Sequence, residues 1–253
     1  MRGNPTRRKT FFVCFVLSFW LAGCAANQGR PSKAIKPGPE VFELHLRQGL
    51  ALLEGREYQK AAAELQAAES LKPDSVKVHN YLGLCRFQQK DYDPALIEFQ
   101  KAAELNPSFA AAFNNMGGVY SMKLRFDKAE EMYKKALSLS PDMISANYNL
   151  GMLLSILGRK DEGSVYLSRG IALDPDYMEK NQEFLSMFNS AASNMKEAYF
   201  AFAKAYALTG NVEKTVSYLE KARKAGFTDW QRILEDNEFE KVRNDPKIRK
   251  FLI

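Results

Sequence analysis

Residues 110–143 decide the fold, and they read AAAFNNMGGVYSMKLRFDKAEEMYKKALSLSPDM. Apolar and small residues recur in this stretch every three or four positions, which places them on one face of a helix. The first such face holds Phe113, Met116, Gly117 and Tyr120, and the second holds Phe126, Ala129, Tyr133 and Ala136. Pro141 cannot continue the second helix, because it has no backbone N–H and its ring clashes with the preceding turn. The stretch therefore predicts two helices joined by a short turn.

The same pattern returns every 34 residues along the chain. The columns that share this period are Gly49, Gly83, Gly117 and Gly151; Ala61, Ala95, Ala129 and Gly163; and Pro73, Pro107, Pro141 and Pro175. They define four units, 42–75, 76–109, 110–143 and 144–177, and a looser fifth unit at 196–229. No unit can bury its apolar face alone, so neighbouring units are expected to stack and bury a continuous core.

This period and these columns resemble the tetratricopeptide repeat (TPR), a helix–turn–helix unit. The resemblance implies an all-α fold, a TPR helix-turn-helix solenoid that winds into a right-handed superhelix with a concave groove. Residues 178–195 break the period, which predicts either an irregular insertion with some helix or a first helix that has lost its partner. Residues 230–253 supply apolar groups at helical spacing, and we predict that they form a C-terminal helical cap.

Two local features within the repeats lead to further expectations. Gly163 and Gly170 stand where the earlier units have alanine, and each interior glycine costs roughly 0.5–1 kcal/mol relative to alanine. We therefore expect the second helix of the fourth unit to be the weakest part of the array. The pair Asp93-Pro94 predicts that a helix begins there, with Asp93 as its N-cap and Pro94 in the first turn.

The N-terminus has the features of a targeting segment. Basic residues at positions 2, 7, 8 and 9 precede an apolar run at 11–22, which is too short for a helix that crosses a membrane. The following Leu21-Ala22-Gly23-Cys24 resembles the lipobox of bacterial lipoproteins. The resemblance implies a signal peptide at 1–23, an acylated Cys24, a flexible tether at 24–40 and, from Ala25, an outer-membrane location facing the periplasm. The alternatives are an uncleaved signal anchor and a secretion signal with an incidental cysteine.

Composition argues against several kinds of partner and chemistry. Residues 1–23 hold four of the 36 basic residues and none of the 30 acidic ones, so the remainder is close to neutral and does not favour nucleic acid. Once Cys14 leaves with the signal peptide and Cys24 is acylated, only Cys85 remains, and we interpret it as a small buried apolar residue. His45 and His79 lack a neighbouring Cys, Asp or Glu pattern, so no metal site is predicted. No catalytic motif is present, and we predict no cofactor, no small-molecule substrate and no enzymatic activity.

The candidate binding residues lie on the face of each first helix that points away from its partner helix. They are Asn80, Tyr81, Leu84, Phe87, Asn114, Asn115, Met122, Tyr148, Asn149 and Met152. This lining is amide, aromatic and apolar. Some TPR domains bind a carboxylate through a fixed set of groove residues, and Asn115 is the only residue of this sequence that matches that set. Asn115 and Asn149 occupy the same position in successive units, which resembles the asparagine ladder that holds a peptide backbone in some TPR superhelices. The alternative is that these asparagines tie loops within their repeats.

These features together predict a membrane-anchored TPR adaptor. It would bind peptide segments of other envelope proteins in its concave groove. Resemblance to TPR lipoproteins suggests pilus or secretin assembly, or the organisation of cell-wall enzymes, as the setting. The alternatives are a structural lipoprotein that associates with itself and, more remotely, an envelope enzyme.

The lipobox gives a direct prediction for the processed protein. Cleavage before Cys24 should leave fatty acyl chains on that cysteine, because a lipid anchor is what the motif provides. Mass spectrometry of the N-terminal peptide from the native host measures this. A processed N-terminus whose cysteine carries no acyl chain would contradict the prediction.

Overall fold

A computed structural model describes residues 38–181 and 195–253, and these residues are helical apart from their turns. The helices of the first four units are α1 (Pro39–Glu54), α2 (Tyr58–Leu71), α3 (Val76–Gln88), α4 (Tyr92–Leu105), α5 (Ala110–Met122), α6 (Phe126–Leu139), α7 (Ile144–Ile156) and α8 (Lys160–Leu173). They are followed by α9 (Tyr177–Lys180), α11 (Met195–Leu208), α12 (Val212–Lys224), α13 (Arg232–Glu235), the 3-10 helix η1 (Asn237–Phe239) and α14 (Pro246–Arg249). The signal peptide, Cys24, and the apolar residues at 184–188 lie outside the described residues.

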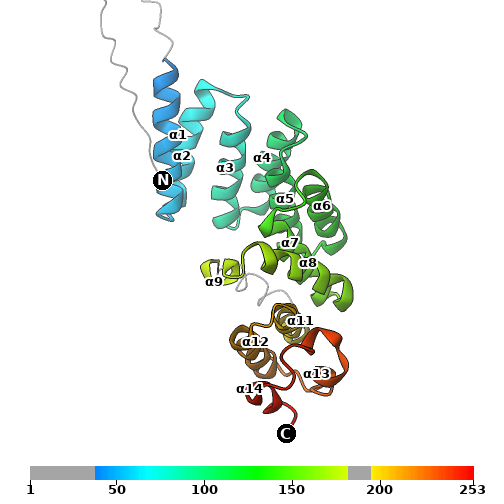
Figure 1. Ribbon diagram of the computed structural model, residues 1–253. Coiled ribbons are helices and arrows are strands. Elements are labelled where there is room, and N and C mark those ends of the chain that lie inside the picture. The colour runs from blue at the N-terminus through cyan, green and yellow to red at the C-terminus, as the bar shows by residue number, and fades with distance from the viewer. Residues whose placement is uncertain (1–37, 182–194) are drawn as a thin grey trace, which may run out of the picture. The chain divides into compact units, whose positions relative to one another are not determined.

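The long helices pack as consecutive hairpins. The pairs α1–α2, α3–α4, α5–α6, α7–α8 and α11–α12 make the most extensive contacts, and the second helix of each of the first three pairs also packs on the first helix of the next (Figure 1). No strand occurs between residues 38 and 181 or between 195 and 253. The predicted all-α solenoid of helix–turn–helix units is therefore confirmed.

The hairpins close where a small residue on one helix faces a large one on the other. A Cβ atom at Gly83 would lie 2.5 Å from the ring of Phe99, and one at Gly117 would lie 2.5 Å from the ring of Tyr133. Both rings are fully buried. The glycine column is thus a packing requirement, because each glycine leaves room for the aromatic ring of its partner helix.

A left-handed residue turns the chain between the two helices of each unit. From the first hairpin to the fifth, these residues are Arg56, Lys90, Leu124, Gly158 and Gly210, and their φ angles are 62°, 66°, 57°, 82° and 77°. In the first turn the N–H of Arg56 bonds the carbonyl of Leu53, and the N–H of Glu57 bonds that of Leu52. This is the Schellman arrangement, and equivalent bonds occur at the other four turns. The pair α11–α12 therefore has the same local geometry as the first four hairpins.

The structure corrects two predicted helix starts. Helix α4 begins at Tyr92, so Asp93 lies in its first turn and binds Lys123 of the next unit instead of capping the helix. Helix α1 begins at Pro39, so Pro39 and Glu40, which were predicted to belong to the tether, are helical. Proline suits the first turn of a helix because the N–H that it lacks would have no partner there.

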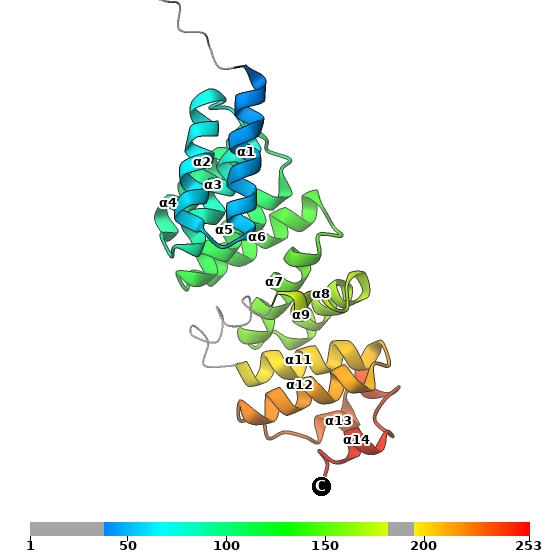
Figure 2. The ribbon, with the colours of Figure 1, turned by 90° about the vertical axis from the view of Figure 1, so that its left-hand side faces the viewer.

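The C-terminal segment packs on the fifth hairpin. Phe227, Ile233, Phe239 and Ile248 are buried in one core with α11 and α12, and Figure 2 shows α13 and α14 beside those helices. Lys204 of α11 is only 3% exposed, and its ammonium lies 3.1 Å from a carboxylate oxygen of Asp236 and 3.1 Å from one of Glu238. The segment therefore neutralises a buried charge as well as covering apolar surface.

The two glycines of the fourth hairpin have a packing role that helix propensity does not take into account. A Cβ atom at Gly163 would lie 2.7 Å from the backbone oxygen of Gly151 and 2.5 Å from the hydroxyl of Ser155. A Cβ atom at Gly170 would lie 2.9 Å from the ring of Tyr148. Helices α7 and α8 approach so closely that alanine does not fit at Gly163 without moving the backbone.

We predict that Gly163→Ala lowers the free energy of unfolding by about 1–3 kcal/mol, the usual cost of overpacking. Helix propensity alone would predict a gain of roughly 1 kcal/mol, so the sign of the change separates the two explanations. Gly170→Ala should cost less, because it meets a side chain and not the backbone. Urea denaturation measures the effect, and Val165→Ala, at an exposed site on the same helix, serves as the control. A more stable Gly163→Ala protein would show that the close approach is not required.

Candidate functional site

A cavity of about 670 Å³ lies on the inner side of the first four units. Helices α3, α5 and α7 supply most of one wall, and residues of α9 and just after it supply another. The lining residues are Arg56, Leu84, Phe87, Gln88, Phe99, Asn114, Asn115, Gly118, Ser145, Asn149, Tyr177, Glu179, Lys180 and Asn181. Cavities of roughly 300–1,000 Å³ are typical of ligand sites, so this one is large enough for a bound group.

Half of the predicted groove residues line this cavity. They are Leu84, Phe87, Asn114, Asn115 and Asn149, all from the first helices of the second, third and fourth units. Each lies on the face that the helical period assigns away from the partner helix, and the periodicity therefore located this wall. Their role in binding stays a prediction.

The other predicted groove residues do not line the cavity, and two of them are inaccessible. Tyr148 and Met152 are fully buried. The ring of Tyr148 stacks on the ring of Tyr177, with 5.0 Å between their centroids, and its centroid lies 6.1 Å from that of Phe202. The hydroxyl of Tyr148 donates a hydrogen bond to the carbonyl of Asp174. The prediction failed here because α9 and α11 cover this part of α7. Asn80 is also buried, and Tyr81 and Met122 are partly buried outside the cavity.

The asparagines form hydrogen bonds between repeats. The Asn115 amide donates to Asn80 Oδ1 at 2.9 Å, and the Asn149 amide donates to Asn114 Oδ1 at 2.8 Å. These bonds join α5 to α3 and α7 to α5. The asparagines thus join the first helices of neighbouring units. This role differs from both alternatives considered for them, a ladder that holds a peptide and bonds to loops within one repeat.

Charged residues reach the cavity from places that the repeat pattern did not indicate. Arg56 comes from the turn between α1 and α2, and Glu179 and Lys180 come from α9. Helix α9 is held in place by Met178, which is buried, and by the Lys214 ammonium 3.2 Å from Glu179. A bond from the backbone N–H of Asp176 and the nearby Lys180 ammonium hold the pKa of Asp174 below its usual range. No sequence pattern indicated the wall formed by α9, because α9 leads into the segment that breaks the period.

The two histidines are not paired with each other. His45 Nδ1 lies 2.7 Å from Glu64 Oε2, and His79 Nδ1 lies 2.8 Å from Glu98 Oε2. Each glutamate follows its histidine by 19 residues, on the second helix of the same hairpin. The expectation that no carboxylate accompanies the histidines is therefore wrong, since the hairpin brings together residues that are distant in the sequence.

Cys85 is fully buried, as the sequence predicted. Burial raises the pKa of its thiol to about 11. The thiol is therefore protonated at neutral pH, which suits a buried residue that packs as a small apolar group.

Family models for the tetratricopeptide repeat match residues 46–109, 110–143 and 144–177, which together make up more than half of the chain. The chain belongs to the tetratricopeptide repeat family. No curated protein matches this TPR chain in sequence.

Solved structures share its fold at low sequence identity. A thermophilic TPR protein of Thermus thermophilus is 16% identical with a TM-score of 0.53, and the match covers 77% of this chain and 96% of that one. The pilF protein of Pseudomonas aeruginosa is 18% identical with a TM-score of 0.51, covering 78% and 98%. The MamA protein is 17% identical with a TM-score of 0.50, covering 78% and 96%.

The TPR repeats support a protein–protein interaction scaffold, and the fold is typical of proteins without enzymatic activity. Among the helices in the described part of the chain, none has the length and apolar character needed to cross a membrane.

We predict that Asn115→Ala combined with Asn149→Ala lowers the free energy of unfolding by about 1–3 kcal/mol, because it leaves the Oδ1 atoms of Asn80 and Asn114 without these donors in a buried setting. Gln88→Ala, at an exposed residue that lines the same cavity, should change it by less than about 0.5 kcal/mol. Urea denaturation of the three proteins tests this. Equal stability would show that the inter-repeat bonds contribute nothing net.

Proposed function

We propose that this TPR protein is a lipid-anchored adaptor that binds an extended segment of another envelope protein in the cavity beside α3, α5 and α7. The observation that carries the proposal is the lining of this cavity, which combines apolar side chains on α3 with amide groups on α5 and α7. An extended chain presents N–H and C=O groups that need partners, together with side chains that gain from apolar contact. The cavity offers both kinds of surface.

The asparagines are suited to holding a peptide backbone. A carboxamide has one acceptor oxygen with two lone pairs and two N–H donors. The bonds between Asn115 and Asn80 and between Asn149 and Asn114 use only part of this capacity. They also fix the side-chain rotamers, so a bound chain would meet amides that are already oriented and would lose less entropy on binding.

Apolar and charged groups would add selectivity for the segment. Leu84 and Phe87 provide an apolar patch on α3, and Gly118 on α5 leaves open space beside it, because a Cβ atom there would have no neighbour closer than 3.9 Å. Arg56, Glu179 and Lys180 add charges of both signs to the lining. We therefore infer a segment with an apolar side chain for the patch and polar groups on either side of it.

The anchor is proposed from the resemblance of Leu21-Ala22-Gly23-Cys24 to a lipobox. An acylated Cys24 would hold the adaptor at the outer membrane, facing the periplasm, and the tether before residue 39 would let it reach its partners. We place the adaptor in pilus or secretin assembly or in the organisation of cell-wall enzymes, and the identity of the partner decides between these. The likeness to pilF is a likeness of fold.

Site-specific photo-crosslinking in the native cell tests the cavity. We expect a crosslinking residue in place of Gln88, which lines the cavity and is exposed, to capture a defined envelope protein. Adding Gly118→Met should reduce that product by roughly tenfold, because its side chain would fill the space beside Phe87 and cost the partner about 1.4 kcal/mol or more. Mass spectrometry identifies the product.

Ala63→Met is the matched control, since it adds the same side chain on an exposed position of α2. It should leave the crosslinked product unchanged. If Gly118→Met does not reduce the crosslinked product, the partner does not bind in the cavity. A product consisting only of a second copy of the chain would favour a self-associating lipoprotein.

A further inference from the structure

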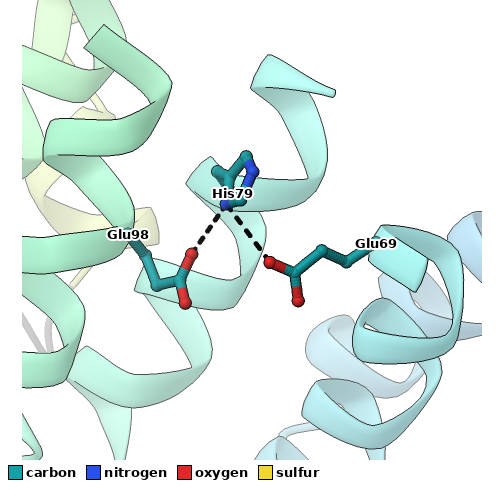
Figure 3. Close-up of side chains that lie close together, drawn as sticks. All are labelled: Glu69, His79 and Glu98. Atoms are coloured by element: carbon teal, nitrogen blue, oxygen red, sulfur yellow. Dashed lines mark hydrogen bonds and ion pairs between the residues drawn. The ribbon is translucent and has the colours of Figure 1, made fainter. Parts of the chain in front are cut away.

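Three side chains from three consecutive helices meet at the junction of the first two repeats. They are Glu69 of α2, His79 of α3 and Glu98 of α4. His79 Nδ1 lies 2.8 Å from Glu98 Oε2 and 3.8 Å from Glu69 Oε1. Figure 3 shows both carboxylates directed at this nitrogen, that of Glu98 from the left and that of Glu69 from the right. One nitrogen and two oxygens therefore converge on a single point.

A backbone contact fixes which ring nitrogen faces that point. His79 Nε2 lies 2.8 Å from the carbonyl oxygen of Pro73, and a carbonyl can only accept, so Nε2 carries the hydrogen. The neutral ring then has its lone pair on Nδ1, directed at carboxylates that also only accept. A cation between them, either a proton or a metal ion, removes this conflict. Metal-binding histidines commonly donate their other N–H to a backbone carbonyl in the same way.

Other repeats show what packing alone requires at this position. In the fourth unit Asn147 occupies it and donates to the carbonyl of Pro141 at 3.0 Å, the counterpart of the bond to Pro73. An asparagine is thus sufficient to hold the turn. In the first unit His45 pairs with Glu64, and α1 is the first helix in the described part of the chain, so no described helix before it supplies a second carboxylate. Holding the turn therefore does not require all three of Glu69, His79 and Glu98.

The spacing and burial of the three groups suit a small divalent ion. Neighbouring ligands around a tetrahedral zinc ion with bonds of roughly 2.0 Å lie about 3.3 Å apart, between the two separations at His79. The imidazole is 6% exposed, so the ring is held firmly, whereas the side chains of Glu69 and Glu98 are 35% and 26% exposed. The exposed side gives an ion a way in and leaves room for a water as the fourth ligand.

We propose that Glu69, His79 and Glu98 bind a divalent transition-metal ion of the zinc class. One imidazole nitrogen and two carboxylate oxygens match the ligands that such ions accept. The ion would join α2 of the first repeat to α3 and α4 of the second. It would thereby stiffen the end of the array next to the tether. This proposal does not depend on what the cavity binds.

Zinc chloride is the probe, added to the full-length protein in detergent after treatment with a chelator and removal of that chelator. Isothermal titration calorimetry should show one zinc ion per chain at this site, and thermal unfolding should shift to higher temperature with zinc, because a ligand that binds only the folded state stabilises it. His79→Asn should weaken zinc binding by more than roughly tenfold and abolish the shift. Glu98→Gln and Glu69→Gln should each weaken it as well.

His79→Asn is expected to fold, because asparagine makes the same turn contact at position 147, and its melting temperature without zinc checks this. His45→Asn is the matched control and should bind zinc like the unaltered protein. No zinc binding by the unaltered protein would overturn the proposal, and the three side chains would then serve only as a structural contact between the repeats. Equal binding by His79→Asn would overturn it too, since the zinc would then be held elsewhere.

Discussion

The close approach of two helices within each hairpin is the constraint on which the rest of this structure depends. At Gly83 and Gly117 the missing Cβ atom makes room for an aromatic ring of the second helix, and at Gly151 and Gly163 the two backbones themselves come together. Substituting a bulkier residue would push the helices apart. The next unit would then lose its packing surface, because in a solenoid each repeat is stabilised by its neighbours. The inner wall of α3, α5 and α7 exists only while this spacing is kept.

The last part of the array is built differently from the first. From α7 onward, aromatic side chains fill one large core that includes Tyr148, Phe202, Tyr206 and Tyr218. Hydroxyls in this core satisfy backbone carbonyls, as when Tyr206 donates to Pro175 at 2.8 Å. Such bonds remove the cost of burying a polar group. This core anchors α9, and α9 in turn supplies Glu179 and Lys180 to the cavity lining.

Polar contacts between repeats occur at both places where we propose that a ligand binds. The asparagine bonds from α5 to α3 and from α7 to α5 set the register of neighbouring first helices. The same amides are oriented in the cavity that we propose as the binding site. At the other side of the second hairpin, His79 holds a turn through Nε2 and faces two glutamates through Nδ1. In both places a group that ties repeats together also has capacity for a ligand.

The sequence by itself determined the repeat, its helix pairs, the burial of Cys85 and the wall formed by Leu84, Phe87, Asn114, Asn115 and Asn149. It could do so because these depend on spacing along one helix or on a column that recurs every 34 residues. The tertiary structure alone decided the burial of Tyr148 and Met152, the reason for Gly163, the charges from α9 and the meeting of His79 with Glu69 and Glu98. Each of these depends on the distance between elements far apart in the chain, and the periodicity of a single helix carries no information about that distance.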